Sequence, residues 1–257
     1  MGKNKLARWA ELGTFPNVIQ HSKGDVEVKD HPVKGNWRKE IFRNENPVVL
    51  ELACGKGEYS VALSSIFPSK NFIGIDIKGA RIWRGAKTAS ENRSGNVAFL
   101  RTRIEFITHF FAEDEVDEIW IIFPDPHPGK KNSNKRLTCP WFLNQYRHLL
   151  KDGSLIHLKT DNSELFSYTR NLAIKNSLEI LTETSDLYSS GEKERSGFYR
   201  IFSDNSHGTG SNDVADKVLA IRTHYESMFL DKGLKICYLT FRLDKKKIIE
   251  DGWQKKD

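Results

Sequence analysis

Long apolar runs and paired cysteines are both absent from this sequence of 257 residues. It has no run of about 18 apolar residues, the length that a membrane-spanning helix needs, so we expect no membrane span. Residues 1–11 lack the apolar core of an export signal, and we expect a cytoplasmic protein. The three cysteines, Cys54, Cys139 and Cys237, form no Cys-x-x-Cys pair. Their spacing argues against a metal site or a redox couple and fits reduced thiols in the cytoplasm.

The chain has fewer acidic than basic residues, with 34 Asp and Glu against 40 Lys and Arg and a net charge of +6. This excess favours polyanionic partners. The charges are also segregated, because residues 130–136 contain four Lys and Arg residues and no acid, whereas residues 113–118 contain five acids. We expect Lys130, Lys135 and Arg136 to bind the phosphates of a nucleic acid, with an ordinary solvated loop as the alternative.

Short apolar segments alternate with segments of helical spacing from residue 47 onwards. Strand-like runs lie at 47–52, 71–76, 97–100, 119–123, 155–158, 178–184 and 234–243. Residues 58–67, 82–86 and 140–150 carry apolar side chains at helical spacing, and a further helix is expected from about residue 213. The alternation predicts an α/β fold with a doubly wound, mostly parallel, Rossmann-like sheet.

Two regions outside this alternation are polar and irregular. Residues 1–46 are broken by Gly and Pro and carry aromatic side chains at no clear period. We therefore expect an irregular N-terminal arm ahead of a single domain at 47–257. Residues 185–212 are rich in Ser, Gly and charged residues, so we expect a polar insertion that forms a surface loop or is partly disordered.

A glycine-containing turn, Glu51-Leu-Ala-Cys-Gly55-Lys-Gly57, joins the first strand of this domain to its first helix. Glycines let the backbone approach a ligand, and the start of a helix offers free N–H groups. Asp76 ends the next strand about 20 residues later, the spacing at which an acid meets a ribose in nucleotide-binding sheets. The glycines alone are compatible with a simple tight turn, but their pairing with Asp76 favours a cofactor site.

Glu51 distinguishes between two cofactors. An NAD site is compatible with the turn and the following acid, but the turn lacks the Gly-x-Gly-x-x-Gly pattern. A carboxylate at Glu51 would repel a pyrophosphate, whereas it can accept hydrogen bonds from the ammonium group of S-adenosylmethionine. We therefore expect S-adenosylmethionine as the cofactor, with Glu51, Gly55, Gly57 and Asp76 among its binding residues.

Asp125 lies in the segment Phe123-Pro-Asp-Pro-His-Pro128, directly after a predicted central strand. Ligands bind at the carboxyl ends of strands in open α/β sheets, so this position favours a catalytic role for Asp125. The prolines restrict the backbone and are expected to hold Phe123 and Asp125 in extended conformations, which would mount the acid rigidly. A proline-rich turn with a solvated Asp is the alternative.

Six motifs between Val48 and Phe241 carry a resemblance to a known family. They are Glu51 with Gly55-Lys-Gly-Glu58, Phe72-Ile-Gly-Ile-Asp76, Phe123-Pro-Asp-Pro126, Asn134-Lys-Arg-Leu-Thr138, Thr160-Asp-Asn162 and Thr223-His-Tyr-Glu226. The chain resembles the bacterial tRNA (guanine-N7-)-methyltransferases, which are class I S-adenosylmethionine-dependent enzymes that modify a guanine in the tRNA variable loop. The resemblance implies a methyltransferase sheet with an antiparallel C-terminal strand.

The resemblance also implies three groups of site residues, for the cofactor, the target guanine and the tRNA. They are Glu51, Asp76 and the catalytic Asp125 for the cofactor, Asp161, Thr223 and Glu226 for the guanine, and Lys135 with Arg136 for the tRNA. Four positions depart from the family, and at one of them His127 replaces the usual Trp after Asp-Pro. Ala53 replaces a usual glycine, and Gly129 replaces a substrate-contacting Lys whose role passes to Lys130. Arg103 stands close to where an Asp commonly contacts the adenine, so this contact has no assigned residue.

Other functions remain compatible with these residues. Methylation of a different RNA base or of a small phosphorylated metabolite would use the same cofactor turn, and a tRNA-binding protein without activity would keep the fold. The basic stretch disfavours a metabolite, and the presence of Glu51, Asp76 and Asp125 disfavours an inactive protein. We expect tRNA as the partner and no obligate protein partner.

Overall fold

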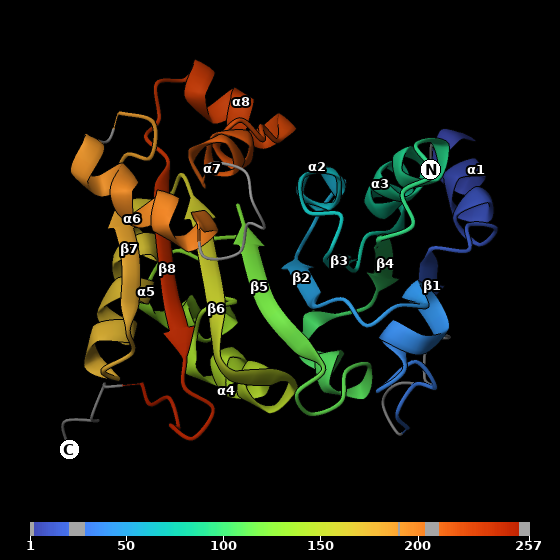
Figure 1. Ribbon diagram of the computed structural model, residues 1–257, viewed down its shortest axis with the longest axis horizontal. Helices are drawn as coiled ribbons and strands as arrows, with labels where there is room; N and C mark the ends of the chain where they lie inside the picture. Colours follow the sequence, from blue (N-terminus) through green and yellow to red (C-terminus); the bar gives the residue numbers. More distant parts are fainter. Residues whose placement is uncertain (1–2, 21–28, 190, 204–210, 252–257) are drawn as a thin grey trace. The chain divides into compact units, whose positions relative to one another are not determined.

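The computed structural model describes residues 3–20, 29–189, 191–203 and 211–251 (Figure 1). The chain forms two compact units, one made of Met1–Trp120 with His148–Lys151 and one made of Ile121–Arg147 with Asp152–Asp257. We call them the first unit and the second unit. Strand β5 (Val116–Ile122) begins in the first unit and ends in the second.

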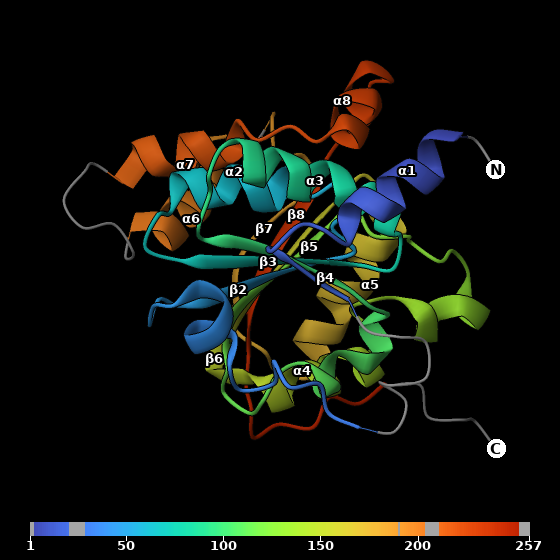
Figure 2. The same ribbon diagram turned by 90° about the vertical axis from the view of Figure 1, so that its right-hand side faces the viewer.

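Parallel strands form the centre of the first unit. In order, the neighbours are β1 (Val18–Gln20), β4 (Val97–Arg101), β3 (Asn71–Asp76) and β2 (Val48–Leu52), and each pair is parallel. Every residue of β2 and β3 is buried. A parallel sheet is covered on both faces, which explains the continuous apolar sequences of these strands. Figure 2 shows α1 (Lys3–Leu12), α2 (Glu58–Ile66) and α3 (Gly79–Glu91) on one face of β2, β3 and β4.

The residues before position 47 are more regular than the sequence predicts. They contain α1, the strand β1 and a π-helix, η1 (Trp37–Phe42). Trp37 is fully buried, its indole N–H donates to the carbonyl of Phe110 at 2.8 Å, and its ring stacks on Phe111 at a centroid distance of 5.2 Å. The expectation of an irregular arm is wrong for these elements. Trp37 and Phe110 are 73 residues apart, and local spacing does not reveal such partners.

The second unit contains the antiparallel strands. The last strand, β8 (Cys237–Leu243), pairs antiparallel with both β6 (Leu150–Thr160) and β7 (Ile180–Thr184). The strand order of the eight-stranded sheet is β1-β4-β3-β2-β5-β6-β8-β7. The expected doubly wound, mostly parallel sheet with an antiparallel C-terminal strand is therefore confirmed.

The expected polar insertion at 185–212 contains the helix α6 (Glu192–Ser203), while its residues 190 and 204–210 lie outside the described part of the chain. Phe198, Ile201 and Phe202 of α6 are buried, and the rings of Phe198 and Phe202 pack at a centroid distance of 4.8 Å. The expectation of a surface loop is thus wrong for α6. Its apolar residues recur at helical spacing, but the charged and small residues around them dominate the composition.

The remaining helices are short. They are η2 (Ile104–His109), η3 (Lys130–Lys135), α4 (Pro140–Leu149), α5 (Ser163–Lys175), α7 (Ser211–Leu219) and α8 (His224–Asp231). Among the described residues, no helix combines the length and the apolar character that a membrane crossing requires.

Candidate active site

The turn between β2 and α2, in the first unit, leaves space beside its backbone. Gly55 has φ +57°, and a Cβ built on it would meet no atom within 4 Å. Gly57 has φ +68°, and a Cβ there would lie 2.4 Å from the ring of Phe99, so no side chain fits. Ala53 has φ +57°, a left-handed conformation that favours the glycine usual in the family. The turn therefore presents backbone to a ligand at Gly55, whereas Gly57 lets the turn pack closely against Phe99.

Asp76 ends β3 and ties this turn to the strand. Its Oδ2 accepts a hydrogen bond from the N–H of Gly55 at 2.9 Å, and its Oδ1 accepts one from the N–H of Lys78 at 2.7 Å. The structure thus brings Asp76 and the glycine turn together, as their spacing in the sequence predicts. Each oxygen of a carboxylate has two lone pairs, so Asp76 can still accept a hydrogen bond from a ribose hydroxyl.

Glu51 lies on β2 and is only 5% exposed. Its Oε2 accepts hydrogen bonds from the N–H of Ser60 at 2.8 Å and from the Ser60 hydroxyl. Burial raises the pKa of Glu51 to about 8, and the two bonds from Ser60 oppose this rise. A cation bound beside Glu51 would favour its ionised form. The sequence did not single out Ser60, whose role depends on its place in the first turn of α2.

Asp125 follows β5 in the second unit and is exposed. Among the described residues, its Oδ1 accepts one long hydrogen bond, 3.4 Å, from the N–H of His127. Phe123 has φ +46°, so the expectation that the prolines hold it extended is wrong. The N–H of Phe123 donates to the carbonyl of Lys159 at 2.8 Å, and its ring packs on Phe229 at a centroid distance of 5.6 Å. These tertiary contacts override the local preference of the residue before a proline.

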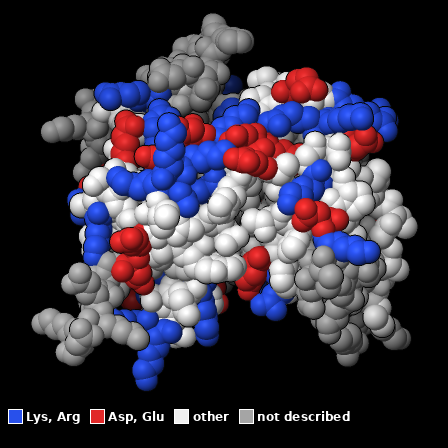
Figure 3. All heavy atoms as spheres, turned by 90° about the horizontal axis from the view of Figure 1, so that it is seen from below, with Lys and Arg blue, Asp and Glu red and all other residues white. Residues whose placement is uncertain are grey.

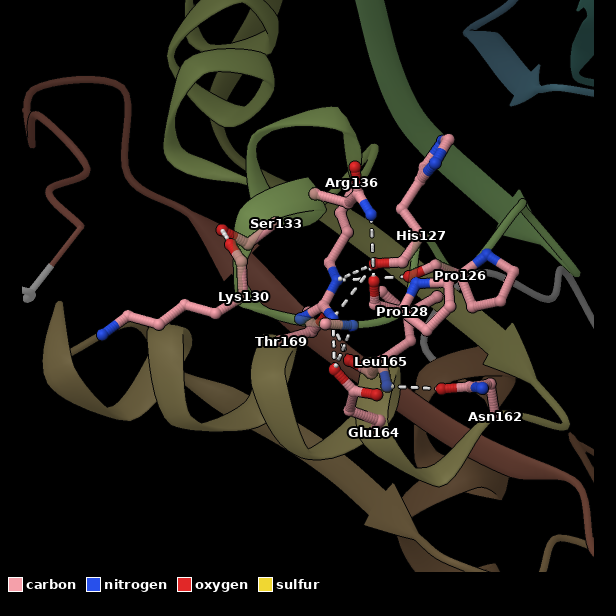
Figure 4. Close-up of polar contacts among 12 residues, drawn as sticks. Pro126, His127, Pro128, Lys130, Ser133, Arg136, Asn162, Glu164, Leu165 and Thr169 are labelled. Carbon is pink, nitrogen blue, oxygen red and sulfur yellow. Dashed lines mark hydrogen bonds and ion pairs between the residues drawn. The ribbon is translucent and has the colours of Figure 1, made fainter.

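Arg136 is turned inward, although the sequence predicts a contact with tRNA. Its side chain is 3% exposed and pairs with Glu164 at 2.5 Å. The guanidinium donates to the carbonyl of Pro126 at 3.2 Å and to that of His127 at 3.2 and 3.3 Å (Figure 4). It also lies 4.5 Å from the centroid of the Tyr168 ring. Because the guanidinium is almost fully buried and already donates to three acceptors of the protein, two carbonyls and the Glu164 carboxylate, it is poorly placed for the expected phosphate contact.

Glu226 lies on α8 and is completely buried. Its Oε1 forms an ion pair with Lys159 Nζ at 2.7 Å, and it accepts hydrogen bonds from Arg222 Nη1 at 3.3 Å and from the Tyr188 hydroxyl. The N–H of Glu226 donates to Oγ1 of Thr223, which caps the helix. Oε2 is also buried, and among the described residues it has no hydrogen-bond partner. Such atoms are rare in folded proteins, so Oε2 is a candidate contact for a ligand.

Lys159 is a residue of this cluster that the sequence analysis missed. It lies near the end of β6, is 1% exposed, and has its pKa lowered to about 8 by burial, against the opposing effect of Glu226. A lysine inside the apolar run 155–160 could have revealed it, because a buried ammonium needs an acidic partner. Asp161 follows β6 directly, and burial raises the pKa of this half-buried acid.

The basic helix η3 borders a cavity of about 530 Å³ in the second unit. Lys130, Ser133, Tyr168 and Lys175 are among the residues that line it. Lys130 and Lys135 are exposed, in contrast to the buried arginine that follows them. Figure 3 shows Lys and Arg side chains next to Asp and Glu side chains on the face seen from below.

Across the described part of the chain, no group of three or more His, Cys, Asp and Glu side chains is arranged so that it could hold a metal ion.

Comparisons with known proteins agree with these features. The family described as "Putative methyltransferase" matches residues 45–197. The chain is 44% identical to a tRNA (guanine-N(7)-)-methyltransferase of Bacteroides fragilis (strain YCH46), covering 95% of this chain and 87% of the relative. It is 45% identical to a protein of the same name from Porphyromonas gingivalis (strain ATCC BAA-308 / W83), covering 90% and 86%. A solved structure of an antibiotic-related methyltransferase shares the fold, with a TM-score of 0.52, 15% identity and coverage of 84% and 96%. The chain therefore belongs to the tRNA (guanine-N(7)-)-methyltransferase family.

Proposed function

We propose that this protein transfers the methyl group of S-adenosylmethionine to N7 of a guanine in the variable loop of tRNA, which gives 7-methylguanosine. The buried Glu226 is the observation that supports guanine as the target base. Three side chains hold its Oε1, whereas Oε2 is buried without a partner among the described residues. Guanine N1–H and N2–H₂ form a donor pair that adenine lacks, and Oε2 can accept one of these two donors. Asp161 and Thr223 complete the proposed guanine site.

Glu51, Gly55, Gly57 and Asp76 are the proposed binding residues for the cofactor. S-adenosylmethionine supplies an electrophilic methyl group on a positively charged sulfur. Glu51 in its ionised form accepts a hydrogen bond from the cofactor's ammonium group, and Asp76 accepts one from its ribose. The space beside Gly55 lets a ligand lie against the backbone. The two acids, Glu51 and Asp76, suit a cofactor that carries positive charge.

Asp125 is the proposed catalytic residue, and its task is orientation rather than proton removal. Guanine N7 has an in-plane lone pair and no proton, so the new N–C bond forms while the S–C bond breaks and no general base is needed. The purine becomes positively charged in this step. A carboxylate held close to it stabilises that charge as it develops. The exposed position of Asp125 leaves its oxygens accessible to a substrate and to the cofactor.

The proposed partner is tRNA, with the exposed Lys130 and Lys135 in contact with its phosphates. Their ammonium groups can follow a phosphate backbone without reading its sequence. We place the protein in the cytoplasm, where the three free and buried cysteines stay reduced.

The decisive experiment maps modified bases by mass spectrometry after incubation with bulk unmodified tRNA and labelled S-adenosylmethionine. We expect 7-methylguanosine at one variable-loop position, and none from an Asp125→Ala variant that unfolds at the same urea concentration as the wild type. Methylation of an exocyclic amine or a ribose would contradict the N7 assignment. Label in small metabolites but not in tRNA would favour a metabolite enzyme, and tRNA binding without any methyl transfer would favour an inactive binding protein.

A further inference from the structure

Arg136 holds the backbone directly after Asp125. Its guanidinium donates to the two consecutive carbonyls of residues 126–127, at 3.2 to 3.3 Å (Figure 4). The partner of this guanidinium, Glu164, also accepts a hydrogen bond from the N–H of Gly129 at 3.2 Å. One ion pair thus fixes three backbone groups of the four residues that follow the catalytic acid.

The Asp125 segment does not hold this shape by its own local preferences. Phe123 has φ +46° and His127 has φ +43°, so two non-glycine residues on either side of Asp125 lie in the left-handed region. This conformation is disfavoured for residues with a side chain, because the Cβ comes too close to the following carbonyl oxygen. The Asp125 carboxylate adds only the long contact to the N–H of His127. The position of Asp125 therefore depends on contacts that come from other elements.

The chemistry of these contacts suits arginine and not lysine. The guanidinium is planar, reaches two carbonyls and a carboxylate at once, and stacks over the Tyr168 ring at 4.5 Å. A lysine ammonium is a point charge that cannot span these acceptors in one plane. Arg136 also lowers the pKa of Glu164, with a smaller effect from the N–H of Gly129, which keeps Glu164 ionised.

We propose that Arg136 is a positioning residue for catalysis, which keeps Asp125 in its reactive place and makes no contact with tRNA phosphate. The proposal rests on the proposed role of Asp125 in methyl transfer. It predicts that loss of Arg136 slows the chemical step while tRNA binding stays the same, because a reacting group displaced by about 1 Å loses on the order of a hundredfold in rate.

The test measures kcat, KM for tRNA and the salt dependence of tRNA binding for Arg136→Lys and Arg136→Ala. We expect kcat to fall between tenfold and a hundredfold on the scale of such displacements, with KM and the salt slope unchanged. Lys135→Ala serves as the contrast, with a higher KM and a shallower salt slope. Arg170→Ala is the matched control, because Arg170 also pairs with a carboxylate, Glu183 at 2.7 Å, but holds no part of the Asp125 segment. Its kcat and KM stay at the wild-type values.

Wild-type kcat in Arg136→Lys would overturn the proposal, and so would a raised KM with a shallower salt slope, which indicates a phosphate contact. The urea midpoint of unfolding reports whether each variant is folded, because binding of S-adenosylhomocysteine would also respond to the proposed contact with Asp125. If Arg136→Ala fails this check, Arg136→Lys decides, since it retains the charge and most of the side-chain volume. Failure of the proposed function is a separate outcome, because the wild-type protein would then fail to methylate tRNA at N7.

Discussion

The protonation state of Glu51 makes cofactor binding depend on pH. The pKa of Glu51 is raised to about 8 by burial, so its carboxyl group is mostly protonated at pH 6. A protonated carboxyl cannot accept the ammonium group of the cofactor as an ion pair. With a pKa of about 8, only about one molecule in a hundred is ionised at pH 6, and affinity changes about tenfold per pH unit below 8.

Isothermal titration calorimetry with S-adenosylhomocysteine, which keeps the ammonium group and lacks the reactive methyl, measures this effect directly. We expect the Kd to fall about fiftyfold between pH 6 and pH 8, where half of the Glu51 carboxyl groups are ionised, equivalent to about 2.3 kcal/mol. Glu51→Gln binds weakly with no such slope. Ser60→Ala removes the hydroxyl hydrogen bond, the stronger of the two Ser60 bonds that lower the pKa of Glu51, and keeps the backbone one, so its slope extends to higher pH. A Kd that stays constant over this range in the wild type, or an equal slope in Glu51→Gln, would refute the reasoning.

Three further outcomes follow from the same structure. The pKa of Glu51 in the folded protein lies above its ordinary value of 4.5, so the free energy of unfolding decreases as the pH rises from about 4.5 to about 8. We expect urea titrations of Glu51→Gln to lack this decrease. Lys159→Met leaves the buried Glu226 with one cation, Arg222, which lies farther away, and lowers the free energy of unfolding by about 3–5 kcal/mol. The double variant with Glu226→Gln regains much of this free energy. An unchanged urea midpoint in Lys159→Met would contradict this prediction. Gly57→Ala drives a Cβ into the Phe99 ring and lowers the urea midpoint of unfolding, while Gly55→Ala places a Cβ in the space proposed for the cofactor and weakens calorimetric affinity. Equal urea midpoints of the two variants would speak against the packing argument.

The cofactor turn could be predicted from the sequence because its parts act locally. The glycines, Glu51 and the strand that ends at Asp76 lie within one βαβ unit, where spacing along the chain determines spacing in the structure. The strand pattern likewise predicted the sheet, since buried parallel strands have continuous apolar sequences.

The roles of Arg136 and Glu226 could not be predicted in this way. Arg136 sits among lysines in a basic stretch, and only its pairing with Glu164, 28 residues further on, turns it inward. Glu226 has its ion-pair partner in Lys159, on a different element of the fold. Charge and composition describe what a side chain can bind, but tertiary contacts decide what it does bind. The same limit applies to Trp37, whose partner is 73 residues away.

The close contact between Gly57 and Phe99 extends to two other glycines. A Cβ at Gly74 would lie 2.9 Å from the Phe99 ring, and a Cβ at Gly85 would lie 2.7 Å from it. A single aromatic ring therefore excludes side chains at three positions that are separated in the sequence. We therefore expect Phe99, Gly57 and Gly74 to vary together among relatives, because a smaller residue in place of Phe99 relieves the contact at both glycines. Gly85 stays restricted in either case, since a Cβ there would also lie 2.6 Å from the carbonyl oxygen of Lys56.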